Sequence, residues 1–200
     1  MFKRVTFEAK TDLEAEVIAV DLLRLSADKI TINVLEEKDG INEYEAYVDV
    51  LLALEGKKYL QAIFKELTIP CLMEVRTLNN QTEIFYTINS EENPLLIGKD
   101  GKNLDALQTL LKAYLNEFVS GRIMVSIDIG NYKEQRKRKL EMVAVEVAQK
   151  VQKTKVTAHL QPMNPFERRI VHSRLTDWKN IETESKGEGD KRHVTIKYKE

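Results

Sequence analysis

Two glycines, Gly98 and Gly101, enclose a two-residue bend that carries a lysine and an aspartate. Because glycine has no β-carbon, such a bend lets a phosphodiester approach the main chain closely. A helix beginning at Gly101 would face the anion with its free amide groups and the positive end of its dipole, and Lys99 and Lys102 add charge on either side. The pattern therefore predicts a site for the backbone of a single-stranded nucleic acid, with the bases splayed onto adjoining apolar side chains. The predicted contact residues are Ile97, Gly98, Lys99, Asp100, Gly101, Lys102 and Leu104.

A pair of glycines at this spacing is also typical of a helix cap or of tight packing, so the spacing alone leaves both interpretations open. Two other phosphate-binding loops are excluded. A Walker loop needs a longer spacing and a terminal Lys-Ser or Lys-Thr pair, and the stretch around Gly98 has neither. A dinucleotide fingerprint needs three glycines in a β-α-β context, which this stretch also lacks.

A second candidate contact is formed by Arg168 and His172, which lie four residues apart and so share one face of a predicted helix. An arginine fork can bind a phosphate through two hydrogen bonds, and a neighbouring imidazole can donate another. Arg169 and Arg174 extend the positive charge around the helix. The alternative is structural: Arg168 would pair with an acidic neighbour, and His172 would pack.

The first segment, residues 1–54, is predicted to fold in the order β-α-β-β. Alternating apolar residues predict strands near residues 2–7, 30–34 and 44–50. Lys38-Asp39-Gly40 predicts the turn between the last two. Thr11 or Asp12 is expected to cap the helix, whose apolar positions recur at helical spacing. These positions are Leu13, Val17, Ile18, Val20 and Leu22.

The second segment, residues 55–130, is predicted to fold in the order α-β-β-α-α-β. A helix over 59–67 precedes a hairpin that turns at Asn79-Asn80, and a short helix over 91–97 is interrupted by Gly98. A longer helix over 101–119 and a strand over 123–129 follow. This order, with G-x-x-G between adjacent helices, is the arrangement of a type II KH domain, whose loop clamps about four backbone nucleotides.

The third segment, residues 131–200, is predicted to fold in the order α-α-β-β. A long helix over 132–153 begins with five cations, and Pro162 and Pro165 bracket a loop before a second helix over 165–177. Strands are predicted over 181–185 and 194–198. The whole chain is thus predicted to be an α+β protein of three small modules. The apolar side of the long helix is marked by Met142, Val143, Val145, Val147 and Ala148.

Two motifs resemble one family. The stretch Leu96-Ile97-Gly98-Lys99-Asp100-Gly101-Lys102-Asn103-Leu104 is similar to the KH motif of the Jag (KhpB, SpoIIIJ-associated) family. Residues 161–172, which read Gln-Pro-Met-Asn-Pro-Phe-Glu-Arg-Arg-Ile-Val-His, resemble that family's R-3-H domain. Residues 1–54 look like its Jag-N domain. They depart from it at 38–43, where many relatives carry a basic, glycine-rich stretch.

The resemblance implies a function and several partners. It implies binding of single-stranded RNA, with single-stranded DNA as an open alternative, and post-transcriptional regulation linked to cell envelope growth, division or sporulation. It further implies partnership with a small KhpA-like KH protein, association with the YidC/SpoIIIJ insertase, and pairing of KH domains, for which a homo-oligomer is one form.

Charge and composition narrow the class of protein. Residues 1–54 carry 6 basic and 12 acidic side chains, whereas residues 131–200 carry 17 and 10, so a polyanion is expected to be drawn to the C-terminal segment. No signal peptide or membrane span is predicted, and the scattered histidines and single Cys71 predict no metal site and no internal disulfide. We therefore expect a cytoplasmic protein without cofactors. For aromatic residues such as Trp178, buried packing is favoured over base stacking.

Three functions are compatible with the chain to different degrees. The leading hypothesis is an RNA-binding protein that is not an enzyme and has no catalytic residues. The alternative is a protein-interaction adaptor at the insertase or division machinery whose KH scaffold does not bind RNA. A nuclease or nucleotide hydrolase is disfavoured because the sequence shows neither a clustered acidic metal site nor an activated nucleophile.

Overall fold

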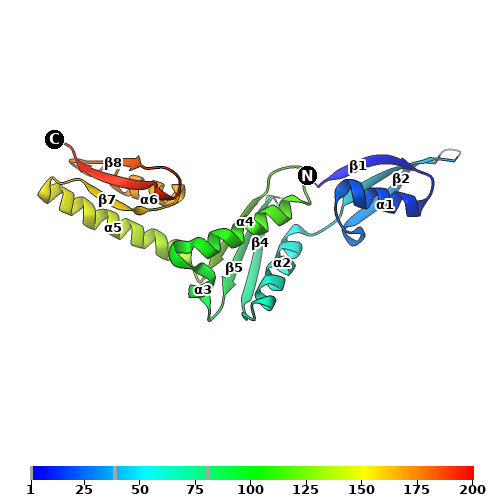
Figure 1. Ribbon diagram of the computed structural model, residues 1–200, viewed down its shortest axis with the longest axis horizontal. Coiled ribbons are helices and arrows are strands. Elements are labelled where there is room, and N and C mark those ends of the chain that lie inside the picture. Colours follow the sequence, from blue (N-terminus) through cyan, green and yellow to red (C-terminus); the bar gives the residue numbers. More distant parts are fainter. Residues whose placement is uncertain (1, 38–39, 80–81) are drawn as a thin grey trace. The chain divides into compact units, whose positions relative to one another are not determined.

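The computed structural model describes residues 2–37, 40–79 and 82–200 (Figure 1). The chain divides into two compact units, residues 1–130 and residues 131–200. The predicted turns at Lys38-Asp39-Gly40 and Asn79-Asn80 lie partly outside the described residues. Within them, Gly40 and Asn79 both have positive φ angles, as tight turns often require.

The N-terminal part of the first unit confirms the predicted β-α-β-β order. Strand β1 (Arg4–Ala9) is followed by helix α1 (Asp12–Leu23), and strands β2 (Ile30–Glu36) and β3 (Asn42–Val48) complete an antiparallel sheet of order β1-β3-β2. The Thr11 hydroxyl accepts a hydrogen bond from the Glu14 amide at 3.2 Å, so Thr11 is the N-cap.

Helix α1 buries a different face from the one predicted from the sequence. Its buried residues are Ala15, Ala19 and Leu23, whereas Leu13 and Val17 are 74% and 65% exposed. Because alanine side chains are short, they bring the helix axis close to the sheet, which leaves the larger aliphatic side chains at the opposite side of the helix facing solvent. Helical spacing alone therefore predicted the helix correctly but not its orientation.

Residues 52–129 confirm the predicted α-β-β-α-α-β order. Helix α2 (Leu52–Glu66) precedes β4 (Leu72–Leu78) and β5 (Glu83–Asn89), and helices α3 (Asn93–Ile97) and α4 (Lys102–Asn116) precede β6 (Met124–Ile129). Strand β5 is central: it pairs antiparallel with β4 and parallel with β6. Its inward residues Ile84, Tyr86 and Ile88 are fully buried, as the alternation predicted.

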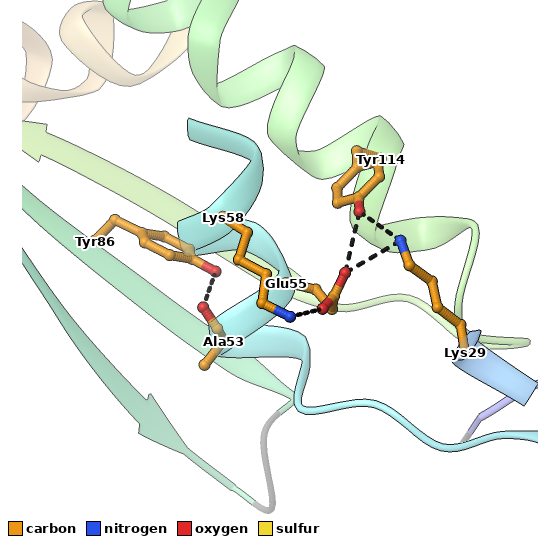
Figure 2. Close-up of polar contacts among 6 residues, drawn as sticks. All are labelled: Lys29, Ala53, Glu55, Lys58, Tyr86 and Tyr114. Carbon is orange, nitrogen blue, oxygen red and sulfur yellow. Dashed lines mark hydrogen bonds and ion pairs between the residues drawn. The ribbon is translucent and has the colours of Figure 1, made fainter. Parts of the chain in front are cut away.

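Helix α2 begins seven residues before the predicted start. Gly56 lies inside it, where a β-carbon would collide with the Tyr86 hydroxyl, so this glycine lets helix and sheet approach closely. The same hydroxyl donates to the Ala53 carbonyl at 3.1 Å (Figure 2). A glycine in a sequence usually marks the end of a helix. Gly56 therefore made the start of helix α2 hard to predict, although it is the residue that lets the helix pack on the sheet.

A buried ion-pair network joins helix α2 to Lys29, in the 3-10 turn before β2, and to helix α4 (Figure 2). The Glu55 carboxylate, 7% exposed, lies 3.1 Å from the Lys29 ammonium and 2.9 Å from that of Lys58. The Tyr114 hydroxyl donates to Glu55 at 3.3 Å and accepts from Lys29 at 3.1 Å. Burial alone would raise the pKa of Glu55, but the bonds from Lys58 and Lys29 outweigh it and hold the pKa below its ordinary value.

The second unit contains one strand more than predicted. Helix α5 (Tyr132–Thr154) is followed by β7 (Ala158–Pro162), helix α6 (Pro165–Leu175), β8 (Ile181–Lys186) and β9 (His193–Tyr198). The sheet order is β7-β9-β8, all antiparallel, so the predicted α-α-β-β order becomes α-β-α-β-β. Strand β7 was missed because it is short and ends in a proline, which reads as a loop signal.

The core of this unit lies between the sheet and the two helices. Helix α5 contributes Leu140, Ala144, Ala148 and Val151, so its buried side is not the one predicted. Ala148 is confirmed as buried, but Met142 is 60% exposed. The remaining core residues are Val171, Leu175, Ile181, Val194 and Ile196.

Candidate nucleic-acid interface

The bend between helices α3 and α4 has a backbone that only glycine adopts readily. Gly98 has φ 71° and ψ −180°, and Gly101 has φ 81°. A β-carbon on Gly98 would lie 2.6 Å from the side-chain Cγ of Asn103. Asn103 is itself held by a 2.8 Å hydrogen bond from its amide to the Leu95 carbonyl. The bend is therefore shaped by both glycines and by the asparagine that follows them.

The amide groups of this bend are only partly open, which corrects the sequence-based expectation. The Gly101 amide donates to the Gly98 carbonyl at 3.3 Å, and the Lys102 amide donates to the Lys99 carbonyl. These two donors are thus used inside a 3-10 turn and are not free for an anion. No side chain caps the start of helix α4, although Asp105 places a carboxylate in its first turn and partly offsets the positive end of the dipole.

Two cations flank the bend. Lys99 and Lys102 are exposed, and among the residues that the structure describes neither forms an ion pair. Asp100, between them, is exposed and has φ 55°. Ile97 is half-buried, whereas Leu104 is only 3% exposed. The expectation that Leu104 contacts bases is therefore wrong, because its side chain packs in the core beneath helix α4.

An apolar groove of about 690 Å³ lies beside the bend, between helix α4, helix α3 and the C-terminal end of helix α2. Leu67, Leu95 and Leu110 line it, and each is more than half exposed. Asn103 belongs to both the groove and the bend. An apolar groove therefore lies next to the bend, and its exposed lining residues are aliphatic side chains other than Leu104.

His172 in helix α6 is held by two hydroxyls of strand β8. Its Nδ1 lies 2.7 Å from the Thr183 hydroxyl, and its Nε2 lies 2.9 Å from that of Ser185. Burial, and then the positive charge of Arg168, lowers the pKa of His172. Both ring nitrogens are thus occupied within the fold, which corrects the expectation that this imidazole donates directly to a phosphate. Thr183 and Ser185 were not singled out from the sequence, although their spacing of two placed them on one face of a strand.

Arg168 does not form the acidic pair that the structural alternative required. Within the described part of the chain, no carboxylate lies within ion-pair distance of Arg168, and its Nε is buried without a hydrogen-bond partner. The neighbouring Glu167 pairs instead with Arg136 of helix α5, at 2.6 Å, and closes a capping box with Asn164. Helix α6 is therefore anchored by Glu167, and Arg168 takes no part in this ion pair.

Arg169 lies on a different side of helix α6 from Arg168. It is exposed and lines a groove between helices α5 and α6. Arg174, one turn further along, lines the same groove. The four residues Arg168, Arg169, His172 and Arg174 therefore do not form one site. Arg168 lies near His172, which contacts strand β8, whereas Arg169 and Arg174 line the groove beside helix α5.

The described residues contain neither a metal-binding cluster nor a membrane-spanning helix. No three His, Cys, Asp or Glu side chains among them gather in a way that could hold a metal ion. No helix among them is both long and apolar enough to cross a membrane. His159 and His193 lie side by side on the sheet of the second unit, with facing ring nitrogens 3.3 Å apart, but no third ligand accompanies them in this part of the structure.

Comparisons with known proteins match the sequence of both segments described above. The family model described as "KhpA/KhpB, KH domain" matches residues 57–129, and the model of the R-3-H domain matches residues 138–198. An RNA-binding protein KhpB of Clostridium symbiosum is 34% identical over 203 residues, covering 98% of this chain and 91% of that protein. The RNA-binding protein KhpB of Bacillus subtilis is 33% identical over 210 residues, covering 98% of this chain and 99% of that protein.

Proposed function

Since the chain belongs to the KhpB family, we propose that it binds single-stranded RNA and that this binding, not catalysis, is its activity. The proposed modules are residues 1–54, a KH domain over 55–130 and an R-3-H domain over 131–200. The KH module holds the sugar-phosphate backbone, and the R-3-H module adds phosphate contacts. Tethering two weak sites in one chain raises the overall affinity.

The observation that carries this proposal is the glycine bend at the start of helix α4. Lys99 and Lys102 are exposed there without ion pairs in the described structure, next to a helix start that no side chain caps. A phosphate at this position meets two cations and the helix dipole. Gly98 and Gly101 have positive φ angles, so these glycines keep the bend in this shape. Ile97, half-buried beside the bend, is the apolar residue that we propose to contact a base.

Arg168 is the proposed phosphate contact of the R-3-H module. Its buried Nε has no partner within the described fold, and a buried donor of that kind is costly unless a ligand or water satisfies it. His172 supports the site indirectly: its bonds to Thr183 and Ser185 hold helix α6 against strand β8. The proposed role of His172 is therefore to position Arg168.

The test reverses charge at the bend without touching its glycines. We expect Lys99→Asp with Lys102→Glu to weaken binding of a single-stranded RNA oligonucleotide at least about ten-fold, measured by fluorescence anisotropy. Each lost cation should also lower the slope of log affinity against log salt by about 0.7. The matched control is Lys65→Asp with Lys112→Glu, two exposed lysines outside the bend on helices α2 and α4.

Unchanged affinity in the bend variant, or an equal loss in the control, would remove the bend from the proposal. If the unaltered chain bound no RNA even at low salt, the adaptor alternative would be favoured instead, because phosphate contacts are strongest there.

The apolar groove beside the bend is also a candidate surface for binding a protein partner. The exposed side chains of the groove are aliphatic, and Phe64, which also lines it, is only 1% exposed. Such a surface suits protein packing better than base stacking, so we propose that a small KhpA-like KH domain, or a second copy of this chain, covers Leu67, Leu95 and Leu110. We expect Leu110→Glu to abolish this association in size-exclusion chromatography with light scattering. Association that survives Leu110→Glu would place the interface elsewhere.

The proposed cellular setting follows the family. We infer that the chain acts in the cytoplasm as a post-transcriptional regulator of envelope growth, division or sporulation, and that it associates with a YidC/SpoIIIJ insertase. Sequencing of RNAs crosslinked to the chain in cells tests the first point. Copurification of the insertase with tagged chain tests the second, and its absence under mild detergent would contradict it.

A further inference from the structure

The groove between helices α5 and α6 plays no part in the bend or in the Arg168 site. It encloses about 640 Å³ and lies within residues 131–200. Three cations line it: Lys137 from helix α5, and Arg169 and Arg174 from helix α6. None of them forms an ion pair or hydrogen bond with another side chain in the described part of the unit. Three unpaired cations around one hollow favour an anionic ligand.

Two aromatic side chains line the same groove. Phe166, in the first turn of helix α6, is 68% exposed, and Trp178 is half-buried just beyond the end of that helix. Trp178 packs partly on the core, so packing accounts for its position, as the sequence analysis expected. No such account holds for Phe166, which belongs to no buried cluster of this unit. An exposed ring beside unpaired cations is the combination that single-stranded nucleic-acid sites use, with bases on the ring and phosphates on the cations.

We propose that this groove binds one nucleotide of a single-stranded RNA, with its base stacked on Phe166 and its phosphates held by Arg169, Arg174 and Lys137. The inference rests on the proposed function and adds a second RNA contact to the R-3-H module, on a different side of helix α6 from Arg168. An RNA strand would thus contact helix α6 on two faces.

Two carboxylates, Glu141 and Asp177, also line the groove, and neither pairs with a cation in the described residues. They repel phosphate, so the proposed phosphate contacts are limited to Lys137, Arg169 and Arg174. A carboxylate can also accept hydrogen bonds from the N–H groups on the edge of a base.

Trp178 provides a direct readout, because it is the only tryptophan in the chain and it lines this groove. RNA titrated into the full chain should change the Trp178 emission, and this change should saturate together with the anisotropy of the labelled RNA. The groove variant combines Phe166→Ala with Arg174→Glu. Both residues are exposed, so the fold should be retained. Its control combines Met142→Ala with Lys150→Glu, an exposed apolar residue and an exposed cation of helix α5 outside the groove.

We expect the groove variant to lose the Trp178 response and to bind RNA at least about five-fold more weakly, the loss typical of one stacked base and one phosphate contact. The control should behave as the unaltered chain. The Lys99→Asp, Lys102→Glu variant should keep the Trp178 response, displaced to higher RNA concentration.

The outcomes separate the two proposals. RNA binding without any Trp178 response, or a groove variant that matches its control, overturns the groove while leaving RNA binding by the chain intact. A chain that binds no RNA at low salt overturns both.

Discussion

Single residues around the bend show what a sequence motif can and cannot predict. The two glycines were identified from spacing alone, and the positive φ angles of Gly98 and Gly101 confirm that the bend needs them. The side chains beside them were harder to assign. Leu104 is adjacent in sequence but buried, whereas Leu67, from the end of helix α2, lines the groove by the bend although it is far from Gly98 in sequence. Contacts between elements leave no local signal, which is also why the hydroxyl partners of His172 were missed.

His172 makes the stability of the second unit depend on pH. Its folded pKa lies below the ordinary 6.5, so as pH falls the unfolded chain takes up a proton before the folded chain does. The stability that His172 contributes is therefore present above pH 6.5 and is lost as pH falls below it. We expect the urea midpoint, followed by Trp178 emission, to fall between about pH 7.5 and about pH 5.5, and His172→Gln to reduce that fall.

His159 and His193 are present in both proteins, so only the difference between the unaltered chain and the His172→Gln variant reports on His172. An equal pH dependence with and without His172 would contradict the argument.

Elements were predicted well where their signals were local. The order of elements in residues 1–130 followed from alternation, helical spacing and glycine placement, and the Thr11 cap was correct. The predicted buried faces of helices were wrong where alanines form the packing contacts, and a strand was missed where it is short. Ala15 and Ala19 bury helix α1, and Ala144 and Ala148 bury helix α5, because close helix contact favours short side chains that hydrophobicity patterns weigh lightly. Strand β7 is defined mainly by pairing with β9, a partner far along the chain.

The Glu55 network should stabilise the first unit measurably. Removing one partner of a largely buried ion pair leaves the other charge poorly satisfied, so we expect Glu55→Ala to lower the free energy of unfolding by about 2–4 kcal/mol. Urea denaturation followed by circular dichroism measures this. Because the folded pKa of Glu55 is held low, its contribution is present above pH 4.5 and is lost as pH falls through the folded value.

The control for this network is the exposed pair Arg4–Glu45, at 3.4 Å, where Glu45→Ala should cost no more than about 1 kcal/mol. Equal losses at Glu55 and Glu45 would mean that the buried network contributes no more than a surface pair.

At the scale of the whole molecule, packing and charge divide the chain into two parts, whereas the sequence predicted three modules. Residues 1–54 and the KH elements share the Glu55 network and a bridge between Phe2 and Val119, and they form one compact unit. Residues 131–200 have their own core and carry 17 basic against 10 acidic side chains. Linear charge counts therefore predicted which part should attract a polyanion, but not that the first two modules pack together.

We expect residues 131–200, expressed alone, to fold cooperatively and to keep the Trp178 emission of the full chain, because their core draws only on their own helices and sheet. Residues 1–54 expressed alone should be less stable than in the full chain, since they lose the partners of Lys29. Circular dichroism melting of the two fragments checks both expectations. A noncooperative melt of 131–200 would show that it depends on the rest of the chain.

Helix α1, with its alanines against the sheet and Leu13 and Val17 turned to water, has a consequence for handling the protein. Hydrophobic side chains on a solvent-facing helix lower the solubility of the protein. The surplus of carboxylates in residues 1–54 opposes this effect, because it makes the molecules repel one another. Dissolved ammonium sulfate weakens that repulsion but strengthens the attraction between hydrophobic surfaces. The chain should therefore precipitate at a lower ammonium sulfate concentration than a Leu13→Glu, Val17→Glu variant at the same protein concentration.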